Sequence, residues 1–285
     1  MSIIPRNDKC FVNFNEKIIS SSQPVFTTSN RSFRYGDGLF ESIRIADGKI
    51  CFIKKHISRL LRSMKIMQMD IPKKFSVNFF FSEINNLAYE NGIREGGRVR
   101  LTIFRNDGGF YQAKNNKVSF LIETEHLPDK TYKLNENGIT IAIYSKVKKI
   151  FSPISHLKTN NSIIYILASL WSNEKKVDDS LLLNEQNAVV EATSSNIFLC
   201  KKNKLFTPPL QAGCVDGIMR KQIILLAKKE KINVKEKIIT PDELIESDEI
   251  FLTNAIQGIR WIGCFREKKY DNKMAKKMTA ILLWL

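Results

Sequence analysis

The sequence predicts an α/β (α+β) fold, because strand-like and helix-like periodicities both occur along the chain. Residues 98–104 and 139–147 alternate between two faces with a period of two, as β-strands do. Residues 54–69 instead place apolar side chains at i, i+3, i+4 and i+7, the pattern of an amphipathic helix. The presence of both patterns predicts sheets packed against helices.

A polar segment divides the chain into two predicted domains. Residues 125–137 contain Pro128 and show neither the strand period nor the helix period, so we expect an interdomain linker there. The prediction is a small N-terminal domain over residues 1–124 and a larger C-terminal domain over residues 138–285. A chain of 285 residues is long enough for two modest domains.

The N-terminal domain is expected to begin with short strands and turns. A Gly-Asp-Gly turn then leads into a strand, and Asp47 and Gly48 fit the hairpin turn to a return strand. Pro72 ends the first predicted helix, and Gly92 ends the second. The expected elements after the opening segment 9–30 are, in order, strands 40–45 and 49–53, helices 54–69 and 75–91, and strands 98–104 and 117–124.

The C-terminal domain is expected to combine buried strands with helices. Residues 162–173 are strongly apolar, which predicts a buried helix. Residues 240–243 have the capping-box pattern with proline at the first helical position. Asp216 and Gly217 would cap another helix, whose exposed N–H groups form an anion site. The expected elements are strands 139–147, 181–183, 188–200, 234–239 and 249–253, and helices 162–173, 218–231 and 271–285.

The composition predicts a globular protein. A hydrophobic fraction of 43% allows a substantial core. No apolar run reaches the roughly 18 residues of a membrane helix, and the first nine residues lack the apolar stretch of a signal peptide. The five cysteines are scattered and never form a C-x-x-C pair. We therefore expect no disulfide framework, no metal site and a cytoplasmic location.

The chain is strongly basic, with a formal net charge of +16 and a sequence pI of about 9.6. A basic balance can indicate a nucleic-acid partner, which is one alternative function. The lysines are spread along the chain, often in pairs, and no nucleic-acid-binding motif accompanies them. We therefore expect neither a nucleic-acid nor a membrane partner. The positive field favours small anionic substrates.

Four stretches of the C-terminal domain occur in a distinctive order: residues 156–161, 189–198, 213–220 and 251–255. With them come a Y-G-D-G-x-F-x-x-x-R pattern and an H-x-x-R-L pattern in the N-terminal domain. Together they resemble the fold-type IV pyridoxal-phosphate enzymes, or class IV aminotransferases. That family includes branched-chain and D-amino-acid aminotransferases and aminodeoxychorismate lyase. The resemblance implies that the larger domain binds the cofactor and has a β-barrel-like core.

The resemblance implies pyridoxal 5'-phosphate as the cofactor. Such a site needs a lysine that binds the cofactor covalently, an acid beside the ring nitrogen, and a cradle for the phosphate. Lys158 corresponds to the Schiff-base lysine, which is also the general acid and base, and Glu191 corresponds to the acid. Arg59, in the H-x-x-R-L pattern, corresponds to a phosphate ligand, whereas His56 is expected to be structural. The remaining phosphate contacts would come from Ile218, Met219, Asn254 and Ala255.

The resemblance also implies a substrate pocket. Tyr35 and Arg44 match the aromatic residue and the arginine of the first active-site strand. Arg100 matches a position that binds a carboxylate, and Ser42 could supply a hydroxyl group. Tyr111, in a glycine-rich turn, is a further candidate for substrate contact. Because relatives pair, a homodimer is expected.

Two reactions stay open at the level of sequence. A lyase would release pyruvate and 4-aminobenzoate from 4-amino-4-deoxychorismate, whereas an aminotransferase would pass an amino group from a branched-chain or D-amino acid to a 2-oxo acid. Met219 and Asn254 look like the lyase, because branched-chain enzymes usually carry threonine and glycine there. Ile163 stands where those enzymes carry a tyrosine. Glu41 is closer to the aminotransferases. The lyase is the favoured interpretation.

Overall fold

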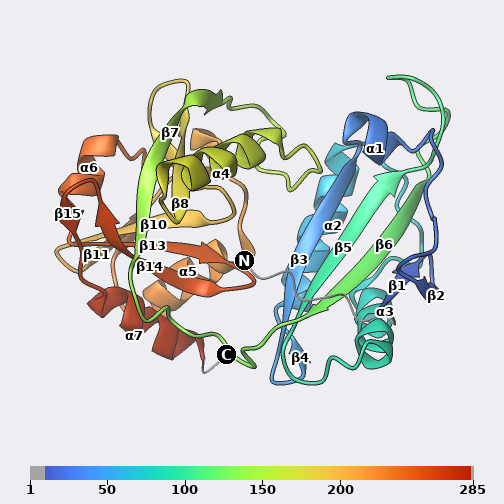
Figure 1. The fold of residues 1–285 in the computed structure, drawn as a ribbon, viewed down its shortest axis with the longest axis horizontal. Helices are drawn as coiled ribbons and strands as arrows, with labels where there is room; N and C mark the ends of the chain where they lie inside the picture. Colours follow the sequence, from blue (N-terminus) through green and yellow to red (C-terminus); the bar gives the residue numbers. More distant parts are fainter. Residues whose placement is uncertain (1–9, 284–285) are drawn as a thin grey trace. The chain divides into compact units, whose positions relative to one another are not determined.

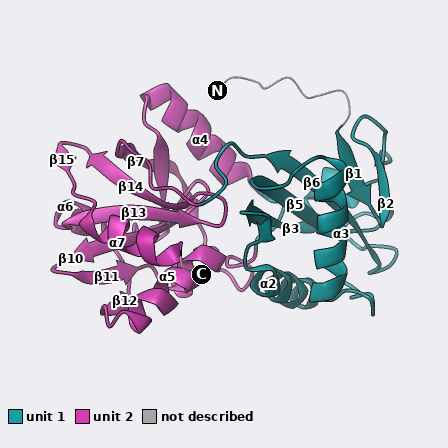
Figure 2. Cartoon of the chain, turned by 90° about the horizontal axis from the view of Figure 1, so that it is seen from below, with its two compact units in different colours: residues 1–131, 158–161 teal, residues 132–157, 162–285 magenta. Residues whose placement is uncertain are grey.

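The structure is a computed structural model that describes residues 10–283 and divides into two compact units (Figures 1 and 2). The first unit comprises Met1–Thr131 and Lys158–Asn161, and the second comprises Tyr132–Leu157 and Ser162–Leu285. The division after Thr131 lies within the segment 125–137 that we expected to be a linker. Lys158–Asn161 are grouped with the first unit although the chain on either side of them belongs to the second.

The first unit is a six-stranded antiparallel sheet in the order β2-β1-β6-β5-β3-β4. Helix α2 packs against β3, and helix α3 packs against β1 and β6. Both helices are amphipathic and bury their apolar stripes, which was predicted for α2. Its elements are β1 (Phe11–Phe14), β2 (Lys17–Ser20), α1 (Arg31–Tyr35), β3 (Gly38–Ala46), β4 (Lys49–Ile50), α2 (Ile53–Ile66), α3 (Val77–Glu90), β5 (Gly97–Arg105) and β6 (Val118–His126).

Helix α1 was not predicted, because five residues are too few to show a helical period. Its signals are local. The Asn30 side chain accepts a hydrogen bond from the Phe33 N–H group and so caps the start of the helix. Gly36 then ends it in the left-handed region, with φ +65°, which glycine adopts without steric cost. The helix therefore delivers the chain into the turn before β3.

The second unit is built on a nine-stranded mixed sheet, in which β12-β11-β10-β13-β14-β7-β8-β9 are neighbours and β15 pairs with β14. The β14–β7 and β7–β8 pairs are parallel. Its elements are β7 (Ile139–Lys149), α4 (Ile163–Lys175), β8 (Asp179–Asn184), β9 (Val189–Ala192), β10 (Asn196–Lys201), β11 (Lys204–Thr207), a 3-10 turn η1 (Leu210–Ala212), α5 (Ile218–Lys229), β12 (Val234–Glu236), α6 (Pro241–Ile245), β13 (Glu249–Asn254), β14 (Gly258–Phe265), β15 (Lys268–Lys269) and α7 (Lys273–Leu282).

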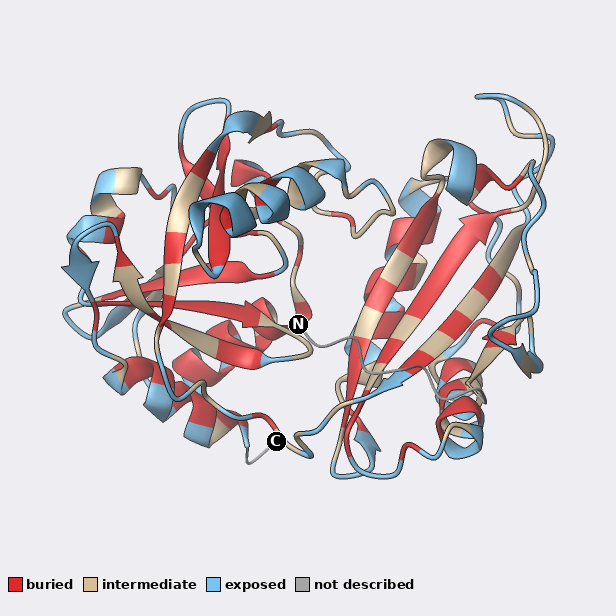
Figure 3. Cartoon of the chain, viewed as in Figure 1, coloured by how far each residue is buried: buried red, intermediate tan, exposed pale blue. Residues whose placement is uncertain are grey.

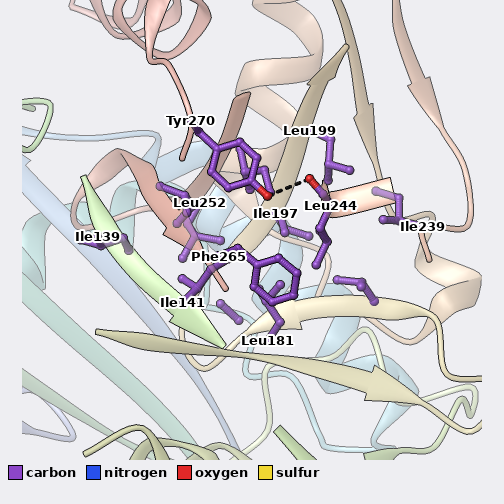
Figure 4. Packing of buried hydrophobic residues seen from close by; sticks show 14 of the residues in the cluster. Ile139, Ile141, Leu181, Ile197, Leu199, Ile239, Leu244, Leu252, Phe265 and Tyr270 are labelled. Atoms are coloured by element: carbon purple, nitrogen blue, oxygen red, sulfur yellow. Dashed lines mark hydrogen bonds between the residues drawn. The ribbon is translucent and has the colours of Figure 1, made fainter. Parts of the chain in front are cut away.

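The sheet of the second unit curls into a half-barrel around one apolar cluster (Figure 4). Leu181 from β8, Leu252 from β13 and Phe265 from β14 meet inside the curl with side chains that are almost fully buried. Tyr270 brings a polar hydroxyl group to this apolar cluster. The hydroxyl donates a hydrogen bond to the Leu244 carbonyl at 2.8 Å and is thereby satisfied. The predicted α/β fold with a barrel-like core in the larger part is confirmed.

The prediction of a buried helix at residues 162–173 was wrong in one respect. Helix α4 buries Ala168 and Ser172, but Ile163 and Leu170 are 69% and 60% exposed. Much of this helix has the colour of exposed residues in Figure 3. The sequence of α4 places apolar side chains on all sides of the helix, a pattern that normally marks a helix buried in a core. Only one stripe of α4 packs on β7 and β8, through Leu182 and its neighbours. The opposite stripe faces outward.

Two further differences concern strands of the second unit. Residues 188–200 form two strands rather than one, because the Ala192 N–H group donates to the Ser195 carbonyl and reverses the chain. Strand β14 was not predicted, although it lies in the middle of the larger sheet. The last two residues of the predicted closing helix, 284–285, lie outside the described residues, as do residues 1–9. Within residues 10–283, no helix is both long and apolar enough to span a bilayer.

Candidate active site

Lys158 lies where the chain adds a short edge segment to the sheet of the first unit. The Phe40 N–H group donates to the Lys158 carbonyl at 2.9 Å, and the Asn160 N–H group donates to the Gly38 carbonyl at 2.9 Å. These bonds continue the ladder of β3 on the side opposite β5. The Lys158 side chain is half-buried, and its Nζ lies 4.2 Å from the centroid of the Phe40 ring. The lysine is therefore held by backbone pairing and by an aromatic face.

The two asparagines after Lys158 lock this segment against the Gly-Asp-Gly turn. Asn160 Nδ2 donates to Ser32 Oγ at 2.7 Å, and Asn161 Nδ2 donates to the Gly36 carbonyl at 3.3 Å. A Cβ atom at Gly36 or Gly38 would come within 2.5 Å and 2.4 Å of these asparagine side chains. The glycines are thus needed for the close approach that places Lys158.

Two of the predicted substrate residues lie beside Phe40 on the same sheet face. Ser42 and Arg100 are cross-strand partners in the β3–β5 register, and the Arg100 guanidinium carbon lies 3.9 Å from the Phe40 centroid. The pKa of Arg100 is lowered from its usual value, mainly because the side chain is partly buried. The charge of Glu123, 4.0 Å away, offsets part of this effect. Because β5 and the Lys158 segment pair with opposite edges of β3, Arg100 and Lys158 flank Phe40.

The structure also brings together the two predicted tyrosines. The ring centroids of Tyr35 and Tyr111 are 5.6 Å apart, and the Arg31 guanidinium carbon lies 5.1 Å from the Tyr35 centroid. They line a cavity of about 390 Å³ in the first unit, together with Asp37 and Arg105. Tyr111 itself is 91% exposed. Both arginines donate to Asp37. One carboxylate offsets only one of the two positive charges, so this ion network keeps a net positive charge.

Arg44, the remaining predicted substrate residue, is buried and bound to backbone. Its Nη2 donates to the carbonyls of Asp129 and Thr131 at 2.7 Å and 2.6 Å. These contacts fix the last residues of the first unit. Its role toward a substrate stays a prediction.

Arg59 lies in a buried ion cluster on the other face of β3. Its Nε donates to Glu41 at 2.8 Å, a terminal nitrogen donates to the second carboxylate oxygen, and His56 Nδ1 lies 2.6 Å from Glu41. Burial would raise the pKa of Glu41, but the Arg59 charge and the His56 contacts outweigh it and lower that pKa to about 2. Burial lowers the pKa of His56. His56 and Arg59 thus hold one carboxylate.

Glu41 was not predicted to have this role, but the sequence holds a signal for it. In the period-two pattern of β3, Glu41 shares a face with Ile43 and Ile45, which are buried. A carboxylate among core residues requires cationic partners. The i, i+3 spacing on α2 presents one such partner, Arg59, and one hydrogen-bonding partner, His56, on the same side of the helix.

Glu191 is buried in the second unit, where four separate segments contact its carboxylate. Lys149 from β7 and the Tyr165 hydroxyl from α4 donate to Oε1, the latter at 2.8 Å. The Val215 N–H group donates to Oε2 at 2.9 Å, and Asn196 Nδ2 lies 3.5 Å from it. Lys149 was missed because β7 is irregular between Tyr144 and Lys149, so a simple alternation does not tell which of two adjacent lysines points inward.

The start of helix α5 lies next to the Glu191 network. Asn196 Nδ2 also donates to the Val215 carbonyl, and a Cβ atom at Gly217 would come within 1.9 Å of Asn196 Oδ1. Gly217 is the N-cap and has no side chain to satisfy the first N–H groups, so those of Ile218 and Met219 lack intrahelical acceptors. Such a helix start favours a phosphate group.

The second predicted phosphate contact, the turn at Asn254 and Ala255, is shaped by the asparagine side chain. Asn254 Oδ1 accepts hydrogen bonds from the N–H groups of Ile256 and Gln257, at 3.0 Å and 2.7 Å. Its Nδ2 donates to Ser195 Oγ at 2.9 Å, and the Tyr132 hydroxyl donates to the Ala255 carbonyl. The Asn254 carboxamide is thus used in hydrogen bonds that shape the turn. This leaves main-chain groups of the turn to contact an anion.

The residues of the second unit fit pyridoxal phosphate chemically. A buried carboxylate suits a protonated ring nitrogen, and an uncapped helix start suits the phosphate at the other end of the cofactor. The two lie in one hydrogen-bonded network through Asn196 and Val215. Between residues 10 and 283, no cluster of three or more histidine, cysteine, aspartate or glutamate side chains could hold a metal ion, and all five cysteines are free thiols.

Comparison with known proteins identifies the class to which this fold and these residues belong. The model for the amino-transferase class IV family matches residues 38–263, so the chain belongs to that family. Its members are enzymes that use pyridoxal phosphate, and the predicted cofactor and enzymatic class are thereby confirmed.

Two relatives and one solved structure show the range within the family. The chain is 29% identical over 276 residues to a putative branched-chain-amino-acid aminotransferase of Methanocaldococcus jannaschii, covering 94% of this chain and 92% of that protein. It is 28% identical over 273 residues to the aminodeoxychorismate lyase of Bacillus subtilis, covering 94% and 91%. The branched-chain aminotransferase of Thermoproteus uzoniensis, solved with norvaline, shares the fold with a TM-score of 0.85, at 23% identity and 95% and 92% coverage.

Proposed function

We propose that the chain is a 4-amino-4-deoxychorismate lyase, which releases pyruvate and 4-aminobenzoate for folate synthesis in the cytoplasm. The observation that carries the proposal is the Asn254 turn. Its carboxamide shapes the loop at a position where branched-chain enzymes usually carry glycine, and Met219 stands at the second helical position of α5, where those enzymes usually carry the hydroxyl of a threonine. The similarity to the lyase of Bacillus subtilis supports the same reaction.

The proposed roles divide the chemistry among residues of this chain. Bound pyridoxal phosphate supplies an electron sink when a proton leaves the carbon that bears the substrate amine. Lys158 holds the cofactor and then takes that proton. The bond from the ring to the enolpyruvyl oxygen breaks, pyruvate leaves, and the ring becomes aromatic. Glu191 pairs with the ring nitrogen, and Arg59, Ile218, Met219 and Ala255 contact the phosphate.

Arg100 is the proposed ligand for a substrate carboxylate. It is partly buried, points along the face that carries Phe40 and Ser42, and has Glu123 as a weak partner at 4.0 Å. A guanidinium binds a carboxylate in a bidentate manner. Tyr35 and Tyr111 are the proposed aromatic contacts, and the net charge of +16 favours the approach of an anion.

A class IV aminotransferase is the second candidate function. Glu41 favours this function, because a glutamate at this position is closer to the aminotransferases. Its side chain is buried and is held by His56 and Arg59, so the residue has a defined structural role. The similarity to the putative aminotransferase of Methanocaldococcus jannaschii supports it equally well.

The test is an assay without an amino acceptor. Cofactor-loaded protein is mixed with 4-amino-4-deoxychorismate, and 4-aminobenzoate is followed by fluorescence while pyruvate is measured in parallel. We expect repeated turnovers that give the two products in equal amounts, and none with Lys158→Ala. Loaded protein that releases neither product would refute the lyase, and amino donors would then be screened against 2-oxoglutarate and pyruvate.

We further propose that two copies of the chain pair through the outward stripe of α4, formed by Ile163, Ile166, Leu167 and Leu170. This stripe is uncharged in a chain of net charge +16, so two copies can meet there without lysines facing each other. Light scattering should give twice the chain mass, and Ile166→Glu with Leu170→Glu should give the monomer. A monomeric parent protein would refute the homodimer.

A further inference from the structure

Lys149 is a buried lysine that the proposed chemistry does not use. Its side chain lies at the end of β7 and is 10% exposed, whereas the adjacent Lys148 is directed elsewhere and donates to Asn187 at 2.7 Å. Lys149 Nζ contacts Glu191 Oε1 and donates to the Tyr165 hydroxyl at 2.6 Å. A buried ammonium is costly unless a counter-charge and hydrogen bonds satisfy it, so this contact is a defined structural feature.

The donors around Glu191 occupy every acceptor position of its carboxylate. Oε1 faces Lys149 and Tyr165, and Oε2 faces Val215 and Asn196. An ionised carboxylate has about four lone-pair sites, so the chain itself fills them. A ring nitrogen that binds Glu191 must therefore share the carboxylate with an internal ammonium.

We propose that Lys149 is a positioning residue that fixes the Glu191 carboxylate and, as its internal counter-charge, limits how strongly Glu191 holds the cofactor ring nitrogen protonated. This inference rests on the proposed function, in which Glu191 pairs with that nitrogen. A positive charge a few ångströms from a base disfavours its protonation. Removal of the Lys149 charge should therefore make the ring nitrogen keep its proton to higher pH.

Two other titratable groups near Glu191, the Tyr165 hydroxyl and the Cys214 thiol, keep their protons over the pH range of the experiment. Burial, followed by the Glu191 charge, raises the pKa of the Tyr165 hydroxyl far above its usual value. Burial, with a contribution from Glu191, raises the pKa of the Cys214 thiol to about 12. Asp216 and Arg220, which also act on Cys214, carry opposite charges. Neither the Tyr165 hydroxyl nor the Cys214 thiol therefore loses its proton between pH 6 and pH 10.

The experiment is nitrogen NMR of the full-length protein loaded with pyridoxal phosphate that is labelled with nitrogen-15 in the ring. The chemical shift of the ring nitrogen reports its proton directly, and the midpoint of its titration is compared among variants. We expect Lys149→Met to raise the midpoint by about one to two pH units relative to the parent protein. Lys149→Arg should restore the parent midpoint, and Lys148→Met, the matched control, should not change it.

Equal midpoints in the parent protein, Lys149→Met and Lys149→Arg would overturn the inference. If Lys149→Met does not fold, Lys149→Gln removes the charge but keeps a donor, and its midpoint decides instead. Glu191→Gln separates this inference from the proposed function. A midpoint unchanged by Glu191→Gln shows that Glu191 does not contact the ring, whereas a change there without a change in Lys149→Met refutes the role of Lys149 alone.

Discussion

Two buried glutamates, one in each unit, are held in different ways. Glu41 receives both of its side-chain partners from one helix, α2, where His56 and Arg59 stand three residues apart. Glu191 receives its partners from β7, α4, β10 and the segment before α5. Glu41 therefore joins one helix to one strand. Glu191 joins four segments beside an uncapped helix start, where an anionic cofactor would bind.

The difference teaches that burial of a charge does not by itself mark chemistry. Both carboxylates lie on strands among apolar residues and both are less than 5% exposed. Perturbed ionisation is common at functional sites, but structural ion pairs perturb it too. We assign the Glu191 network to the cofactor and the Glu41 cluster mainly to stability, and four predictions test that division.

The largest effect is expected for Glu191→Gln. This variant keeps the size of the side chain but removes the negative charge that we propose pairs with the ring nitrogen, so catalysis should fall about 1,000-fold, within the usual range for loss of acid–base assistance. Turnover of the loaded enzyme is the measurement, with Glu185→Gln, on a surface loop, as control. A loss of less than tenfold would remove Glu191 from the chemistry.

Arg59→Ala should lower the free energy of unfolding by about 3 to 5 kcal/mol, because it leaves the buried Glu41 carboxylate without its strongest partner. Urea denaturation of the cofactor-free protein measures this effect. The double variant Glu41→Leu with Arg59→Met removes both charges and should regain most of the stability. If cofactor affinity recovers as well, Arg59 is not a phosphate ligand.

Acid should weaken the parent protein more than that double variant. The pKa of Glu41 is lowered from 4.5 to about 2 in the folded state, so its stabilising contribution is complete above pH 4.5 and is lost as pH falls from 4.5 through 2. The shift corresponds to about 3 kcal/mol. Unfolding free energies of both proteins at several pH values between 7 and 2.5 would show this, and parallel curves would contradict it.

The smallest effect is expected from His56. Burial lowers its pKa from 6.5, so the unfolded chain binds a proton there more readily than the folded chain, and stability falls as pH drops below 6.5. His56→Gln cannot take that proton and should lose less stability between pH 6.5 and 5. A variant with the same slope as the parent protein over this range would show that His56 binds protons equally in the folded and unfolded states.

The sequence predicted those features that depend on local pattern. The amphipathic stripe of α2, the capping box at Thr240 and the strand at Gly97–Arg105 follow from spacing alone and were found in the structure. The resemblance supplied the family, the cofactor and the fold, which the comparisons confirm.

The features that were missed depend on tertiary contacts. Which of Lys148 and Lys149 turns inward is set by the irregular pairing of β7 with β8. The exposed stripe of α4 could not be recognised, because an apolar helix looks the same whether it meets its own chain or solvent. The partner of Glu41 required two elements to be placed together.

Chemical mapping of the lysine that carries the cofactor would test the proposed role of Lys158 without relying on activity. Loaded protein is reduced with borohydride, digested and analysed by mass spectrometry for a pyridoxyl group. We expect the group on Lys158, held between the Gly-Asp-Gly turn and Phe40, and its absence from that position in Lys158→Ala. A pyridoxyl group on Lys149 or on a surface lysine, with Lys158 unmodified, would contradict that role.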